Sequence, residues 1–237
     1  MTKLNRTQTE FVESVLKLNP PVAAFDCDGT LWAGDAGEGF FRWSMEQGMV
    51  SDEIARWARA RHDDYRAGLV DEDTMCGEMC TMYQGLRADA LQKATDEFFA
   101  MGIAPGIFPE MRDLVQRLLA GGTKVWAVSS SNHWIIRSAM RMFGIPHDQI
   151  LATEVVVKDG VVGDDLVRIP SGPGKPEALR EVLTSPPDCA FGNSVWDREM
   201  LEMTRRPFVI NPSPRLQEIA EGKGWPIYHP KAHANGA

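Results

Sequence analysis

Two kinds of hydrophobic pattern alternate along most of the chain. Short apolar runs, each ending at a polar or turn residue, occupy residues 22–25, 124–128, 188–191 and 206–210. Amphipathic segments with a helical period lie between them, at residues 108–120, 132–143, 175–183 and 214–222. Short buried strands that alternate with helices are typical of a parallel sheet covered on both faces. The pattern therefore predicts an α/β fold with a three-layer core.

Residues 36–100 interrupt this alternation, because they contain amphipathic helical segments and no convincing strand. Ser51, Asp71 and Asp89 each precede such a segment, and side chains of this kind cap helix starts. The interruption predicts an all-helical subdomain, inserted after the first core strand. We place its boundaries at residues 34–104, with the core formed by residues 1–33 and 105–237.

A further pattern covers residues 153–167, TEVVVKDGVVGDDLV. Two runs rich in β-branched residues flank Asp159 and Gly160. An Asp-Gly pair between such runs is a strong signal for a two-residue hairpin turn. The segment therefore predicts a small β-hairpin.

Two acidic residues follow the first apolar run directly, in the stretch DCDGT. Asp26 and Asp28 lie at the end of what the pattern predicts to be a buried strand. Two neighbouring buried carboxylates are costly unless a cation neutralises them. Because residues i and i+2 of an extended segment point the same way, both carboxylates can face one bound group. Taken alone, the stretch is also explained as a surface turn.

Other residues with polar or charged side chains suited to binding or catalysis follow the ends of later strands. Ser129 comes after residues 124–128, and Asn193 and Asp197 lie in GNSVWD after residues 188–191. Lys175 opens a helix after the glycine-containing loop SGPG, where its charge suits a phosphoryl group. Carboxylate and amide oxygens are ligands that Mg²⁺ selects. Each residue alone is explained by a helix cap, a turn or a solvated charge, but their order along one sheet edge favours a shared site.

With these motifs, the sequence resembles the haloacid dehalogenase superfamily in its phosphoserine phosphatase-like branch. The resemblance spans nearly the whole chain and includes DCDGT, the Ser129 motif, the hairpin leading into GPGK, GNSVWD, and VINPSPRLQEIAEGKGW near the end. It implies a Rossmann-like core with a helical cap of the C1 type. It also implies a Mg²⁺-dependent phosphomonoesterase.

The resemblance assigns a role to each core residue. Asp26 would attack phosphorus to give an aspartyl-phosphate, and Asp28 would act as general acid and then as general base. Ser129 and Lys175 would neutralise the phosphoryl oxygens. Mg²⁺ would be held by the Asp26 carboxylate, the Asp28 carbonyl and Asn193. Asp197 would bind a metal-bound water.

One residue departs from the family pattern. The family motif has Asp where this chain has Asn193, so we expect a working site with weaker metal affinity. The departure also leaves open a different class of function, a phosphate-binding or regulatory protein with little turnover. Retention of Asp26, Asp28 and Lys175 argues against that alternative.

The residues around and after Asp26 indicate which substrate the protein binds. Asp35 stands where phosphoserine phosphatases place the carboxylate that recognises the substrate amine, whereas Met79 replaces their carboxylate-binding arginine. Arg66 and Arg87 are candidates to compensate. Trp32 is a candidate for holding a quaternary ammonium, and we also expect contacts from Thr30 and Ser130. The pattern favours an amino-alcohol phosphate such as phosphocholine, with phosphoserine as the alternative.

Composition limits the remaining classes of partner. The net charge of −8 and the pI near 5.2 argue against a basic face for nucleic acid. The chain has no apolar run approaching the roughly 18 residues of a membrane span. The four cysteines lack metal-type spacing, and the first 20 residues do not form a secretory signal. We therefore expect a cytoplasmic protein that acts on a small phosphorylated metabolite, and the sequence carries no signal for its oligomeric state.

Overall fold

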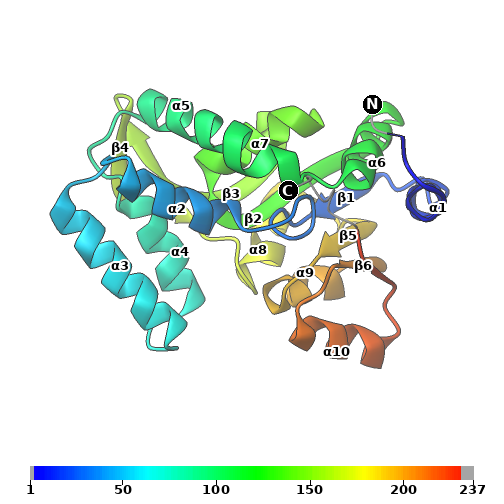
Figure 1. The fold of residues 1–237 in the computed structure, drawn as a ribbon. Helices are drawn as coiled ribbons and strands as arrows, with labels where there is room; N and C mark the ends of the chain where they lie inside the picture. The colour runs from blue at the N-terminus through cyan, green and yellow to red at the C-terminus, as the bar shows by residue number, and fades with distance from the viewer. Residues whose placement is uncertain (1–2, 231–237) are drawn as a thin grey trace.

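The computed structural model describes residues 3–230 and contains one seven-stranded sheet (Figure 1). The strand order is β4-β3-β2-β1-β5-β6-β7, and every neighbouring pair is parallel except β3 and β4. The strands are β1 (Val22–Phe25), β2 (Lys124–Asn132), β3 (Ile150–Lys158), β4 (Val161–Arg168), β5 (Cys189–Gly192), β6 (Arg206–Ile210) and β7 (Ile227–Tyr228).

Helices cover both faces of this sheet and complete the predicted three layers. On one face lie α1 (Arg6–Leu16), α6 (Pro109–Ala120) and α7 (His133–Phe143), and on the other α8 (Gly174–Val182), α9 (Arg198–Glu202) and α10 (Pro214–Lys223) (Figure 1). Alternate residues of a strand enter opposite layers, since Phe25 packs in the first and Ala24 in the second. The predicted α/β architecture is confirmed.

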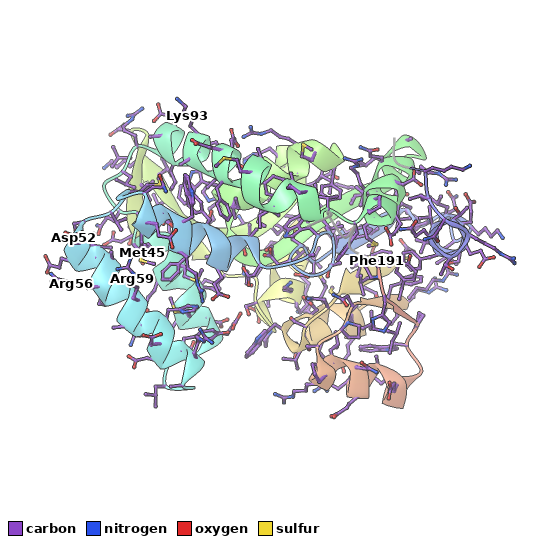
Figure 2. All side chains as sticks on the ribbon, in the orientation of Figure 1. Met45, Asp52, Arg56, Arg59, Lys93 and Phe191 are labelled. Atoms are coloured by element: carbon purple, nitrogen blue, oxygen red, sulfur yellow. The ribbon has the colours of Figure 1, made fainter. Side chains whose placement is uncertain are left out.

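Aromatic rings fill the middle of the first layer. Phe25 of β1 stacks on Phe191 of β5 with 4.1 Å between ring centroids, and Phe191 stacks on Phe208 of β6 at 4.9 Å. Figure 2 labels Phe191 among the side chains that fill the space beside the sheet. These contacts hold β1, which is followed by Asp26, against β5, which is followed by Asn193.

Four helices lie between β1 and the return of the chain to the core. They are α2 (Ala36–Glu46), α3 (Asp52–Arg66), α4 (Glu72–Thr81) and α5 (Ala88–Phe98). The Ser51 and Asp71 side chains accept hydrogen bonds from the first turns of α3 and α4, as predicted. The prediction for Asp89 is wrong, because α5 begins two residues earlier than expected, with Arg87 at the capping position. Figure 1 shows α3 and α4 as a pair at one end of the molecule.

The chain passes between core and cap at two adjacent segments. The Ala33 amide donates to the Gly106 carbonyl at 3.0 Å, and Trp32 forms a bridge with Ile107. The two crossings therefore run side by side. The boundaries at residues 34 and 104 stay a prediction that agrees with this pairing.

The predicted hairpin is present, with Asp159 and Gly160 at its turn, but it is longer than expected. β3 pairs in parallel with β2, so the hairpin continues the main sheet. Three backbone hydrogen bonds, each 2.9 Å long, also join the hairpin to the segment between α4 and α5, from Gly85 to Val162, from Val162 to Leu86, and from Ala88 to Gly160. The hairpin thus attaches the cap to the core at a third place.

A buried carboxylate joins the two ends of the described chain. Glu110 of α6 is completely buried, and it accepts hydrogen bonds from Gln8 of α1 and from the Tyr228 hydroxyl of β7, each at 3.0 Å. Phe11 of α1 stacks on Tyr228 with 3.8 Å between ring centroids. We call these four residues the Glu110 clasp. Among residues 3–230, no helix is long and apolar enough to cross a membrane.

Candidate active site

The core residues predicted from sequence meet around one cavity of about 470 Å³. It lies at the carboxyl ends of β1, β2 and β5, where a parallel sheet of this kind binds its ligands. Residues of the cap line the opposite wall. The predicted residues that line it are Asp26, Asp28, Asp35, Ser129, Ser130, Lys175 and Asn193.

Lys175 is the central cation of the site, and it is 2% exposed. Its ammonium group donates to Asp26 Oδ1 at 2.7 Å, to Asp197 Oδ1 at 2.6 Å and to the Val128 carbonyl at 3.1 Å. All three N–H bonds are therefore used. The two carboxylates raise the pKa of Lys175 against the opposing effect of burial. Lys175 thus stays charged beside the nucleophile candidate.

Asp26 lies immediately after β1 and is 6% exposed. Its Oδ2 accepts a hydrogen bond from the Thr30 hydroxyl at 2.7 Å. Burial raises the pKa of Asp26 to about 6, with a further rise from Asp197, although Lys175 acts in the opposite direction. Lys175 and Thr30 therefore fix the two oxygens of Asp26 in position.

Asp28 is held by three donors on the cap side of the site. Its Oδ1 accepts from the Trp32 indole N–H at 2.8 Å and from the Ala36 amide at 2.5 Å, and its Oδ2 accepts from the Ser131 hydroxyl at 2.7 Å. Burial raises the pKa of Asp28 to about 8, and the nearby Asp35 carboxylate adds to the rise. Asp28 is therefore suited to carry and release a proton near neutral pH.

Two predicted substrate contacts are corrected by this geometry. Trp32 is completely buried, lies edge-on to Phe99 and directs its N–H at Asp28, so it positions the acid from behind. Thr30 is also completely buried, and it orients Asp26, whereas the sequence suggested a contact with the substrate. Neither side chain lines the cavity. Local sequence spacing places both residues near the site but does not determine which carboxylate each one meets.

The carboxyl-terminal end of β2 brings three serines to the cavity. Ser129 belongs to β2 itself and is 2% exposed, and its hydroxyl accepts a hydrogen bond from the Ser131 amide at 3.1 Å. Asn132, not Ser129, caps α7. Ser130 also lines the cavity, as predicted from sequence, and Ser131 is a site residue that the sequence analysis missed. Its position in the run SSSN, two residues after Ser129, was the sequence signal that could have identified it.

Asn193 and Asp197 follow β5 but face different surroundings. Asn193 lines the cavity and packs against Gly29, where an added Cβ would lie 1.8 Å from the Asn193 Nδ2 atom. Asp197 is completely buried, and its Oδ2 accepts from the Asn193 and Ser194 amides at 2.9 and 2.8 Å. With Oδ1 bound to Lys175, Asp197 holds the lysine and the Asn193 loop together. Its predicted contact with a metal-bound water stays a prediction.

The donors around the cavity suit a magnesium ion. The Asp26 carboxylate and the Asn193 side chain both line it, and the donor chemistry is entirely oxygen. Within residues 3–230, neither the Asn193 side chain nor the Asp28 carbonyl takes part in a hydrogen bond, so both oxygens are available. The described residues contain no cluster of three His, Cys, Asp or Glu side chains arranged for a metal. A metal here would therefore rely on one carboxylate, an amide, a carbonyl and water.

A second cavity, of about 140 Å³, opens on the cap side. It shares Asp35, Tyr65 and Glu72 with the catalytic cavity, as well as two serines at the end of β2, Ser130 and Ser131. Asp35 is where the resemblance placed a substrate contact, and it also caps α2 by accepting from the Glu38 amide at 2.7 Å. Tyr65 and Glu72 were missed, because in sequence they are ordinary residues of helical segments.

The arginines considered as carboxylate ligands lie elsewhere. Arg87 donates to Asp89 and to the Asp159 carbonyl at the hairpin turn, and Arg66 lines a separate surface hollow between α2 and α3. Met79 lines the smaller cavity. Among the described residues, neither cavity is lined by arginine.

Comparison with known proteins supports the fold and identifies the family. The family model of haloacid dehalogenase-like hydrolases matches residues 23–202. The histidinol-phosphatase of Neisseria meningitidis is 27% identical over 87% of this chain and 97% of its own length. The phosphoserine phosphatase SerB1 of Mycobacterium tuberculosis is 30% identical over 88% of this chain and 72% of its own.

A solved structure shows the same architecture. A Bordetella pertussis protein of unknown function superposes with a TM-score of 0.77 at 25% identity, over 87% of this chain and 96% of that one. The matched family residues include β1, β2, β5 and the helix that carries Lys175. The chain therefore belongs to the haloacid dehalogenase-like hydrolases, in their phosphoserine phosphatase-like branch.

Proposed function

We propose that this hydrolase is a Mg²⁺-dependent phosphomonoesterase that acts through an aspartyl-phosphate at Asp26. Its substrate would be a small phosphorylated metabolite, an amino-alcohol phosphate such as phosphocholine. The observation that carries the proposal is the position of Asp26 and Asp28 on one cavity wall, with Lys175 bound to Asp26 at 2.7 Å. The phosphatases among its relatives support the reaction class.

In the first step, an Asp26 oxygen attacks phosphorus and the ester P–O bond breaks. The Asp28 proton passes to the departing alkoxide, so that the leaving group departs as an alcohol. Ser129 and Lys175 face the phosphoryl oxygens and stabilise their charge. Bound Mg²⁺, held by Asp26, the Asp28 carbonyl and Asn193, would supply further neutralisation of that charge.

In the second step, Asp28 takes a proton from water, and the water oxygen attacks the aspartyl-phosphate. The acyl–phosphate bond breaks, which releases phosphate and restores the Asp26 carboxylate. Trp32, Ala36 and Ser131 hold Asp28 in one orientation through both transfers. Transfer of the phosphoryl group to a second alcohol would use the same intermediate, and added alcohols would reveal it as a new phosphate ester.

A substrate panel tests this proposal. Purified protein with Mg²⁺ is assayed for phosphate release from phosphocholine, phosphoethanolamine, phosphoserine, histidinol phosphate and a generic aryl phosphate. We expect turnover of the aryl ester and a preference for phosphorylated amino alcohols. Asp26→Asn should abolish turnover, whereas Asp165→Asn, which removes an exposed acid of β4, should not. Absence of turnover with every ester would favour the phosphate-binding alternative.

Two other substrates have specific support. Phosphoserine is suggested by the Mycobacterium relative, but the lack of an arginine among the described cavity residues disfavours a substrate carboxylate. Histidinol phosphate is suggested by the Neisseria relative, and its cationic groups suit the acidic cavity. The panel separates these candidates by kcat/KM. The cytoplasmic location stays a prediction.

A further inference from the structure

The smaller cavity continues the catalytic cavity away from Asp26. Its wall is formed by residues of α2, α3, α4 and the end of β2, and Asp35, Tyr65 and Glu72 border both spaces. A phosphate ester bound at Asp26 would therefore extend its leaving group into this cavity. A protein cavity of roughly 150 Å³ accepts a ligand of the size of benzene. The volume of about 140 Å³ thus suits a compact group of similar size.

The carboxylates on this wall differ in whether a cation already neutralises them. Glu38 forms an ion pair with Arg42 and lies 3.5 Å from His62. Within residues 3–230, neither Asp35 nor Glu72 has a Lys, Arg or His partner at ion-pair distance. The cavity therefore carries two uncompensated negative groups beside the space for the leaving group.

Protein donors hold Glu72 without neutralising it. The Tyr65 hydroxyl donates to Glu72 Oε2, and the Cys76 thiol approaches Oε1 at 3.7 Å. Burial raises the pKa of Glu72, and the charge of Asp35 contributes to the rise. A cation placed between Asp35 and Glu72 would relieve this cost. The position of Glu72 is therefore fixed before the substrate arrives.

Beside Glu72, the wall of the cavity is apolar. Met75, Cys76 and Met79 of α4 line it. Sulfur-containing side chains give polarisable contacts that adapt to the shape of a ligand. A strongly hydrated inorganic ion gains little from such a wall, whereas a cation with carbon substituents fits both the charge and the apolar surface.

From these observations we infer that Glu72, together with Asp35, selects substrates whose leaving group carries a small organic cation. Tyr65 acts as a positioning residue for Glu72. The inference rests on the proposed phosphatase function and extends it from one predicted recognition residue to a two-carboxylate pocket. A primary ammonium and a quaternary ammonium share the chemistry that this pocket requires.

Matched pairs of esters test the inference. Phosphocholine is compared with 3,3-dimethylbutyl phosphate, which has the same shape without the charge, and phosphoethanolamine with propyl phosphate. We expect the wild type to prefer the charged member of at least one pair by about tenfold or more in kcat/KM. Glu72→Gln should lower kcat/KM far more for the charged member of a pair than for its neutral member, mainly through KM, and so remove most of that preference. The preferred pair identifies the kind of ammonium.

Control variants separate a local effect from a general one. Glu53→Gln removes an exposed acid at the start of α3, outside both cavities, and should keep the preference. Tyr65→Phe keeps the ring but removes the hydroxyl that orients Glu72, and should give a smaller loss confined to charged esters. Equal rates for both members of both pairs would overturn the inference, as would an equal loss on charged and neutral esters in Glu72→Gln. Failure to hydrolyse even the aryl phosphate would instead refute the phosphatase proposal.

Discussion

At the scale of single residues, the buried ammonium of Lys175 binds two carboxylates that have little contact with water. Asp197 is completely buried and Asp26 is 6% exposed. Lys175→Met keeps the volume of the side chain but leaves both acids without their cation. We expect the free energy of unfolding to fall by about 3–5 kcal/mol, as for other broken buried ion pairs. Urea denaturation measures this change.

Two comparisons make the Lys175 experiment specific. Lys93→Met, at the exposed position on α5 that Figure 2 labels, should change stability by less than about 0.5 kcal/mol. The double variant Lys175→Met with Asp197→Asn should regain part of the loss, because one unpaired charge is removed. An unchanged stability in Lys175→Met would contradict the ion-pair explanation.

Asn193 gives a second residue-scale prediction, about metal affinity. An aspartate at this position would add a negative charge to a site with one available carboxylate, Asp26. We therefore expect Asn193→Asp to lower the Mg²⁺ concentration for half-maximal activity by about tenfold. Mg²⁺ titrations of the two proteins measure the difference. If Asn193→Ala loses activity while Asn193→Asp keeps the wild-type Mg²⁺ requirement, charge at this position does not set metal affinity.

The site residues that lie in sequence motifs could be predicted from the sequence. Those that come together only through the fold could not. The catalytic cavity is lined by five residues that the motifs predicted, namely Asp26, Asp28, Ser129, Lys175 and Asn193. The partners of these groups depend on side-chain direction, which motif spacing does not determine. Ser131 meets Asp28 within the core, and Tyr65 meets Glu72 between two cap helices, so each contact joins residues of different elements.

At the scale of elements, the first turn of α8 has to approach the preceding loop closely. A Cβ added at Gly174 would lie 2.3 Å from the Ile169 carbonyl oxygen, a backbone atom that cannot move aside alone. Gly174→Ala should therefore displace Lys175, the next residue, lower kcat and destabilise the fold by about 1–3 kcal/mol. Activity assays and thermal unfolding together measure the effect.

A second glycine serves as the control for this variant. Gly222 lies in α10, and an added Cβ would meet no atom within 4 Å. Gly222→Ala should leave activity unchanged and stabilise the protein by about 0.5–1 kcal/mol, because alanine loses less conformational entropy in a helix. A Gly174→Ala protein with normal kcat would show that α8 tolerates the displacement.

The pattern of elements predicted the order of strands and helices but not the extent of the hairpin. β2 and β3 continue beyond their apolar runs because they pair with each other through Ser129 and Asn132. That pairing joins residues that are distant in sequence, so a local pattern does not reveal it. The same reason explains why contacts between the hairpin and the segment 85–88 were not predicted.

At the scale of the whole molecule, the free energy of unfolding should depend on pH through the titration of His133. Burial lowers the pKa of His133 to about 3, with a smaller effect from Arg137. Between its ordinary pKa near 6.5 and this value, the unfolded chain binds a proton that the folded protein does not. The folded state is therefore fully favoured above about pH 6.5 and loses stability as the pH falls toward 3.

Comparison of variants isolates this contribution. His133 is partly exposed, so we expect a loss on the order of 1 kcal/mol at pH 5 relative to pH 7. His133→Gln lacks the titrating group, and its free energy of unfolding should fall less over the same interval. Urea denaturation at pH 5 and pH 7 measures both proteins. Parallel pH dependence in the two proteins would show that His133 contributes nothing.

The Glu110 clasp has a consequence for how the protein is made. Gln8 leaves the ribosome early, Glu110 near the middle of synthesis, and Tyr228 close to the end. Until β7 emerges, the Glu110 carboxylate lacks one of its two donors, and Phe11 lacks the ring on which it stacks. A nascent chain that already carries every catalytic residue therefore still has an incompletely docked α1, which a protease can reach. Synthesis of β7 thus completes the packing of α1, and full docking of α1 waits until Tyr228 has left the ribosome.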